Sequence, residues 1–188
     1  MRKKDLMPTH ADFQSALPYS EFLSRHGTPS DAARWDQFRA QVKLTDAQTR
    51  LLQSFTRRID ILFLAGAWCG DCAFQCPIVE RFAEVAPSIQ IRYLDRDIRA
   101  DLQAELQING GNRVPVAVLY SEDGFEAARF GERPLSEYRR LAKNFIPDGI
   151  FPPTGDRMTE AVADWLEVVE RVHWMLRLSP RIRRLHGD

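Results

Sequence analysis

Hydrophobic and polar positions follow two different patterns along the chain, and these predict the order of its elements. Near the start, apolar residues recur every three or four positions, which is typical of amphipathic helices. From residue 61, short apolar runs alternate with further helical patterns, which is typical of buried strands joined by helices. The expected helices cover 19–26, a segment capped by Ser30 that carries Trp35 and Val42, a segment opened by a Thr45–Gln48 capping box, 72–85 with a break at Pro77, 97–106, 135–145 and 159–178. The expected strands cover 61–64, 89–94, 116–120 and 125–130.

The order of these elements predicts an α/β fold, with a mixed central sheet of at least four strands flanked by helices. Helices connect the first three strands, and such crossovers imply parallel pairing. Asp123-Gly124 predicts a hairpin turn that adds an antiparallel pair. We therefore expect a helical N-terminal extension packed on the core (1–58), an α/β core (59–146), and a linker with a C-terminal helix (147–188).

The last expected helix carries an apolar stripe whose members are alternately four and three positions apart. Such a stripe usually packs against the rest of its own chain. The alternative is the seam of a homodimer, so a second copy of the chain is a possible partner. The stripe consists of Met158, Val162, Trp165, Val169, Val172 and Leu176.

Composition and charge argue against several classes of function. The chain has 188 residues, with 26 basic and 26 acidic side chains, so no overall charge favours nucleic acid or a membrane surface. No apolar run approaches the length of a membrane helix, and the charged start at 1–5 is not followed by a signal-peptide segment. All three cysteines lie between 69 and 76, which excludes a disulfide framework spread over a secreted fold. We expect a cytoplasmic protein whose cysteine cluster serves redox catalysis or metal binding.

The spacing of Cys69 and Cys72 indicates that this cluster could carry out thiol–disulfide exchange. The pair, separated by Gly70 and Asp71, follows a predicted buried strand and opens a helix. Free N–H groups and the helix dipole at that position favour a thiolate, so we expect Cys69 to have a lowered pKa and to be the nucleophile. Cys72 lies one turn along, within reach of a disulfide. It would resolve the mixed disulfide that Cys69 forms with a substrate.

The segment Trp68-Cys69-Gly70-Asp71-Cys72, with Pro77 five residues later, resembles the active-site helix of the thioredoxin family, Trp-Cys-Gly-Pro-Cys with a kinking proline. More narrowly, the chain is similar to bacterial thioredoxin-like proteins that carry a Trp-Cys-Gly-Asp-Cys motif and a helical N-terminal extension. The resemblance implies a thioredoxin fold and thiol–disulfide oxidoreductase activity, with Cys69 and Cys72 as catalytic residues and with no cofactor and no metal.

Two further positions carry the same resemblance. Val114-Pro115 resembles the cis-proline loop of the family, and Gly131 matches the glycine that closes its final hairpin. The resemblance implies that Pro115 is cis and lies against the cysteines. The peptide at Val114 would then bind the substrate backbone like an added strand. Trp68, Gly70 and Asp71 complete the expected substrate-binding residues.

The sequence departs from thioredoxin in ways that affect proton transfer. Asp71 replaces the proline between the cysteines; an acid suits the first turn of a helix, but its charge opposes a nearby thiolate. Thioredoxins bury an Asp–Lys pair that helps to move the proton of the second cysteine, and here Phe63 and Tyr93 occupy those positions. We interpret Tyr93 as a core residue. We expect exchange to be slower or more dependent on pH than in ordinary thioredoxins.

Cys76 is a third departure, because it lies four residues after Cys72 on the same helix face. We interpret it as a buried thiol that acts as a small hydrophobe, and an auxiliary redox thiol is the alternative. We expect the oxidised protein to hold a Cys69–Cys72 disulfide.

Three functions compete at this point. The leading hypothesis is a dithiol reductase of protein disulfides or oxidised cysteines, recharged by an unidentified thiol donor. The second is a redox-gated or inert thioredoxin-fold module that binds a protein partner. The third is a metal or iron–sulfur site on the three cysteines, which would need a distant fourth ligand.

Overall fold

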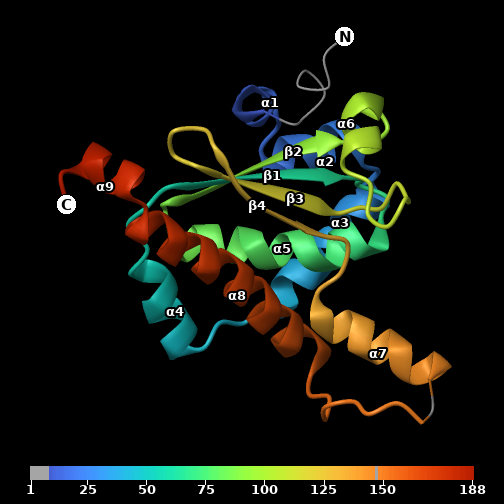
Figure 1. The fold of residues 1–188 in the computed structure, drawn as a ribbon. Coiled ribbons are helices and arrows are strands. Elements are labelled where there is room, and N and C mark those ends of the chain that lie inside the picture. Colours follow the sequence, from blue (N-terminus) through green and yellow to red (C-terminus); the bar gives the residue numbers. More distant parts are fainter. Residues whose placement is uncertain (1–8, 147) are drawn as a thin grey trace.

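The computed structural model describes residues 9–146 and 148–188, and its centre is a four-stranded mixed sheet between two layers of helices (Figure 1). The spatial order of the strands is β2-β1-β3-β4. β1 pairs with β2 in parallel, whereas β1–β3 and β3–β4 are antiparallel. The expected α/β class and mixed sheet are therefore confirmed. The strands are β1 (Ile59–Ala65), β2 (Ile89–Asp95), β3 (Val116–Ser121) and β4 (Glu126–Gly131).

The direction of β3 corrects the sequence-based expectation of parallel pairing. The helix between β2 and β3, α6 (Ala100–Glu105), has six residues and spans about 9 Å. A seven-residue strand such as β2 spans about 23 Å. Because α6 is too short to carry the chain back along the sheet, β3 starts at the end where β2 stops and runs in the opposite direction beside β1.

Helices cover both faces of the sheet, and all seven residues of β1 are buried between them. In Figure 1, α5 and α8 lie against one face and α1 and α6 against the other. The helices α3 and α4 pack on α5, and α2 packs beside β2. The helices are α1 (His10–Ser15), α2 (Tyr19–His26), α3 (Pro29–Gln41), α4 (Asp46–Gln53), α5 (Gly70–Val85), α6, α7 (Leu135–Phe145), α8 (Arg157–Leu178) and α9 (Pro180–His186).

The helix ends can be compared with the caps and breaks that the sequence predicts. The capping box of Thr45 and Gln48 opens α4 as expected. The cap of α3 is Thr28 rather than Ser30, because Pro29 occupies the first helical position and the Thr28 side chain accepts a hydrogen bond from the Asp31 amide. α5 continues through Pro77, where the sequence predicted a break.

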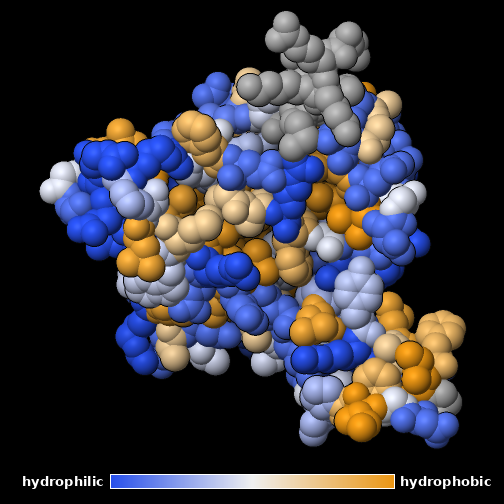
Figure 2. All heavy atoms as spheres, in the orientation of Figure 1, coloured by the Kyte–Doolittle hydropathy of each residue, from blue (hydrophilic) through white to orange (hydrophobic). Residues whose placement is uncertain are grey.

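The apolar stripe of α8 is buried within the chain, as the docking interpretation expects. None of its six residues is more than 7% exposed. The homodimer seam stays a prediction. α7 differs, because several of its apolar side chains, from Leu135 to Phe145, face solvent (Figure 2). Among the described residues, no helix is long and apolar enough to cross a membrane. Pro147, which begins the expected linker, lies outside the described residues.

Candidate functional site

The two cysteines of the motif meet at the first turn of α5. Cys69 is the N-cap residue, and its Sγ accepts a hydrogen bond from the Cys72 amide at 3.4 Å. Gly70 and Asp71 begin the helix, two residues before the expected start at Cys72. The Cys69 residue is 8% exposed and Cys72 is fully buried. The structure is that of the dithiol, since all three cysteines are free. The outer thiol is therefore the one that a substrate can reach.

The loop that ends in Pro115 closes over this thiol. The Val114–Pro115 peptide bond is cis, and the Cys69 thiol donates to the Val114 carbonyl oxygen at 3.6 Å. Gly131 packs against the same loop, because a Cβ there would lie 2.8 Å from the Pro115 carbonyl oxygen. The structure thus brings together segments that the resemblance placed at one site. Val114 is buried as a whole residue, so the loop covers Cys69 in this dithiol structure.

Trp68 forms an exposed platform beside the buried thiol. The residue is 47% exposed, and its indole N–H donates to Asp97 Oδ2 at 3.2 Å. The Arg96 guanidinium lies over the ring, 4.7 Å from its centroid. Such cation–π contacts hold an aromatic ring in place. The Trp68 side chain is therefore presented in a defined orientation.

The helix α3 holds the backbone of this loop from the other side. The Arg34 guanidinium donates to the Trp68 carbonyl oxygen at 2.7 Å, and the Trp35 indole N–H donates to that of Ala67 at 2.8 Å. Sequence reasoning missed both contacts, because they join residues more than 30 positions apart. The N-terminal helices therefore contribute directly to the geometry of the site.

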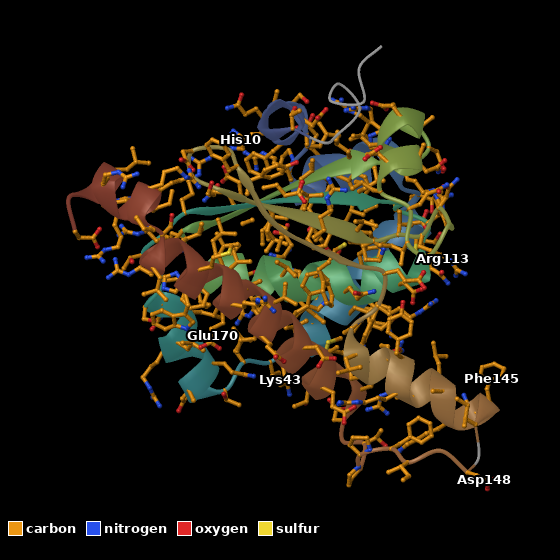
Figure 3. The ribbon with its side chains drawn as sticks, in the orientation of Figure 1. His10, Lys43, Arg113, Phe145, Asp148 and Glu170 are labelled. Carbon is orange, nitrogen blue, oxygen red and sulfur yellow. The ribbon has the colours of Figure 1, made fainter. Side chains whose placement is uncertain are left out.

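Asp71 does not stand alone beside the thiols, as the sequence suggested. Its carboxylate pairs with the Arg133 guanidinium at 2.6 Å, and Arg133 also contacts Glu132 at 3.0 Å. Arg113 lies 3.6 Å from the same Glu132, at the end of the molecule where α5 begins (Figure 3). The buried Gln75 side chain donates to the Glu132 carbonyl oxygen at 2.7 Å and so fixes this segment to α5. Asp71 thus has a cationic partner, which it shares with Glu132.

The titration of the cysteine pair differs from the sequence-based expectation. The hydrogen bond to Cys72 and burial raise the pKa of Cys69, although the amides of Cys72 and Asp71 favour its thiolate. Burial also raises the pKa of Cys72 well above its usual range. The expected lowering of the Cys69 pKa is therefore wrong for the dithiol. In a thiol–disulfide exchange both thiols would have to lose their protons, so the group that accepts these protons matters.

The two positions at which thioredoxins bury an Asp–Lys pair hold Phe63 and Tyr93 in this chain. They are paired neighbours on β1 and β2, and their rings stack with centroids 5.5 Å apart. Tyr93 is a buried core residue, as expected, but its hydroxyl donates to Glu80 Oε1 at 2.8 Å. A carboxyl group therefore reaches this region from α5, which the sequence analysis did not predict.

Cys76 is fully buried on α5, as expected for a thiol in the core. Its side chain interacts with that of Cys72, and burial raises its pKa. Within residues 9–146 and 148–188, no group of three or more histidine, cysteine, aspartate or glutamate side chains is placed to hold a metal ion.

Comparison with known proteins places this site in a family. The family model described as thioredoxin matches residues 16–145, and the chain therefore belongs to the thioredoxin family. The match begins well before β1, so it includes the helices that hold the Trp68 loop. No curated protein matches the chain.

Two solved structures share the fold over nearly their whole length. A crystal structure of a protein of unknown function from Pseudomonas aeruginosa is 22% identical, with a TM-score of 0.69, and the match covers 88% of this chain and 99% of that one. The crystal structure of an HIV epitope scaffold is 20% identical, with a TM-score of 0.65, and the match covers 91% and 99% of the two chains. At these identities the likeness shows the fold alone.

Proposed function

We propose that this protein is a thiol–disulfide oxidoreductase that reduces protein disulfides or oxidised cysteines through Cys69 and Cys72. The observation that carries the proposal is the position of Cys69 Sγ. It lies between the Cys72 amide at the start of α5 and the Val114 carbonyl of the cis-proline loop. Family membership supports a redox role for a pair in this position.

The reaction proceeds by two exchanges. Cys69, as the thiolate, attacks one sulfur of the substrate disulfide and releases the other as a thiolate, which leaves a mixed disulfide on Cys69. Cys72 then loses its proton and attacks Cys69 Sγ. This step forms the Cys69–Cys72 disulfide and releases the second substrate sulfur as a thiol once it is protonated. Two electrons pass from the dithiol to the substrate, and a cellular thiol donor restores the dithiol.

The surroundings of Cys69 suit a protein substrate. Trp68 gives an exposed platform, and the backbone at Val114 offers hydrogen bonds to an extended segment. We place the reaction in the cytoplasm, where the thiol poise keeps such a pair mainly reduced and available for catalysis. The protein would then contribute to cell redox homeostasis.

Trapping of the mixed disulfide tests this proposal. We expect the wild-type protein to reduce insulin disulfides, and Cys72→Ser to accumulate a mixed disulfide through Cys69, because the resolving thiol is gone. Cys69→Ser removes the nucleophile and should abolish both turnover and trapping. Cys76→Ser provides the matched control, because it removes a thiol from the same helix and leaves both cysteines of the pair in place; it should trap nothing.

Trapping through Cys72 in the Cys69→Ser variant would reverse the two roles. Wild-type protein that reduces no disulfide would contradict the proposal. It would favour the second candidate, a redox-gated binding module, for which the 8% exposure of Cys69 is the supporting observation. In that case the oxidation state of the pair should alter partner binding without any turnover.

A further inference from the structure

Three side chains with exchangeable protons lie in a row along α5. Cys72, Cys76 and Glu80 are each four residues apart, so they share one face of the helix, with successive Cβ atoms about 5–6 Å apart. Cys72 and Cys76 are fully buried, and their side chains interact with each other. Glu80 follows one turn later and acts electrostatically on Cys76. The row therefore runs from the resolving thiol of the proposed reaction to a carboxyl group.

The carboxyl group at the end of this row reaches solvent. Glu80 lines an open surface pocket of about 370 Å³, together with Tyr19, Arg39 and Arg92. On its inner side it accepts the hydrogen bond from the Tyr93 hydroxyl at 2.8 Å. The charged and titratable groups that face it are Tyr93 and Arg92 on β2, Tyr19 on α2, Arg39 on α3, and Cys76 and Glu84 on α5.

The resolving step creates a need for such a group. Cys72 must become a thiolate before it can attack Cys69 Sγ, yet its side chain has no exposed surface. Water cannot take its proton directly at that position. The thiol of Cys76 lies on the side of Cys72 that is toward Glu80, and Glu80 lines a pocket open to solvent.

We infer that Glu80 is the proton acceptor of the resolving step and that the Cys76 thiol carries the proton to it from Cys72. This inference rests on the proposed function. Cys76 transfers its proton to the Glu80 carboxylate and receives the proton of Cys72. The Cys72 thiolate then attacks Cys69 Sγ, breaks the bond to the substrate sulfur and forms the Cys69–Cys72 disulfide. Glu80 returns its proton to water in the pocket, and the substrate thiolate takes one from solvent.

This role differs from both earlier interpretations of Cys76. The thiol is neither an inert filler of the core nor a redox partner, because its sulfur forms no bond to another sulfur. Tyr93 is a positioning residue, since its hydroxyl donates a hydrogen bond that holds the Glu80 carboxylate in place.

The pH dependence of the resolving step follows from Glu80. Burial raises the pKa of Glu80, while the hydrogen bond from Tyr93 and the charge of Arg39 oppose this rise. The carboxylate must be ionised in order to accept a proton. The rate of resolution should therefore fall as the pH falls through a pKa above the ordinary value for glutamate. This acid limb of the pH–rate profile should be absent in Glu80→Gln, which has no carboxyl group at this position.

The experiment uses the full-length reduced protein and the chromogenic disulfide dithiobis-nitrobenzoate in a stopped-flow instrument. The first equivalent of thionitrobenzoate reports attack by Cys69, and the second reports resolution by Cys72. We expect Glu80→Gln to slow the second phase about 10²-fold at neutral pH, within the usual range for loss of a general base. The first phase should not change. The difference between the second-phase rates of Glu80→Gln and wild type should shrink as the pH rises, because hydroxide can then deprotonate the Cys72 thiol.

Matched variants separate the relay from a structural effect. Glu84→Gln changes the next acid along α5, which pairs with Arg39 and Arg81 at the surface. Because the Glu84 charge raises the pKa of Glu80, this change should move the acid limb slightly to lower pH and leave both rates at neutral pH close to those of wild type. Cys76→Ala should slow the second phase as Glu80→Gln does, whereas Cys76→Ser should restore it, because a hydroxyl can also carry a proton. Glu80→Asp should recover part of the lost rate.

Equal second-phase rates in Glu80→Gln and wild type would overturn the inference. It would also fall if both phases slowed together, since this would indicate a folding defect. A wild-type protein that releases no thionitrobenzoate at all would instead reject the proposed function.

Discussion

Two acids of α5, Asp71 and Glu80, lie in contrasting settings. At the first turn, Asp71 is paired with the Arg133 guanidinium at 2.6 Å, and its side chain is 29% exposed. Nine residues later, Glu80 accepts a hydrogen bond from the neutral Tyr93 hydroxyl. Burial raises the pKa of Glu80 and so brings its carboxyl group closer to accepting a proton. The helix thus separates an ion-paired acid beside Cys69 from an acid that contacts a neutral hydroxyl.

This separation has a reason in the chemistry of the thiols. A free carboxylate at the first turn would oppose the Cys69 thiolate, and Arg133 removes most of that opposition. A guanidinium in direct contact with Glu80 would make its carboxylate a poorer base. Loss of the partner of Asp71 should therefore affect the attack by Cys69, whereas loss of the partner of Glu80 should affect the resolving step.

Arg133→Ala should give the largest effect at the first turn. The change leaves the Asp71 carboxylate unpaired beside Cys69 and so raises the Cys69 pKa further, by about 1 unit. At pH values below that pKa, the thiolate fraction and the rate of alkylation by iodoacetamide should fall about tenfold. Mass spectrometry of the Cys69 peptide across a pH series measures this rate. Combining the change with Asp71→Asn should return the rate close to that of wild type; a double variant as slow as Arg133→Ala would show that the ion pair is not the cause.

Asp71→Asn should act in the opposite direction and more weakly. It removes the negative charge and lowers the Cys69 pKa, but Arg133 keeps its contact with Glu132 at 3.0 Å and supplies only part of its charge. We expect alkylation of Cys69 to become about threefold faster at neutral pH, because the thiolate fraction rises as the pKa falls. The same alkylation series measures it. An unchanged or slower rate would mean that Asp71 does not act on the thiol through its charge.

Tyr93→Phe tests the other acid and should have the smallest effect. The change keeps the stacked ring and removes only the hydroxyl that stabilises the Glu80 carboxylate. The Glu80 pKa should rise, so the acid limb of the resolving phase should move to higher pH and the rate at neutral pH should fall about two- to threefold. Stopped-flow measurements across pH detect the movement. Tyr19→Phe is the matched control, since the Tyr19 hydroxyl has no hydrogen-bond partner among the described residues. A limb that moves equally in both variants would point to a general loss of packing.

The motif and the strands could be predicted because their signals are local. Cys69 and Cys72 lie within one helical turn, and the apolar run that precedes them becomes the fully buried β1. The hairpin at Asp123-Gly124 is likewise encoded by adjacent residues, and the structure forms it as expected. In each case the residues that decide the structure are neighbours in the sequence.

The partners of the two acids could not be predicted in this way. Arg133 is 62 residues from Asp71, and Tyr93 is 13 residues from Glu80 on another element. Each contact depends on how helix and strand pack, which residue spacing does not reveal. The short α1 was missed for a different reason, since its six residues hold too little periodicity to mark a helix. The pKa of Cys69 depends on its hydrogen bond to Cys72 and on its burial, and no single stretch of sequence encodes that burial.

The hydrogen bonds from Arg34 and Trp35 to the Trp68 loop have a consequence for how the chain can be divided. They join helix α3 to the backbone that leads into the motif, across the segment between α4 and β1. A protease cut in that segment would sever the covalent connection but not these contacts or the packing of α3 on α5. The two fragments should therefore remain associated and complement each other, so that reactivity at Cys69 survives the cut and is lost only when the pieces are separated by denaturant.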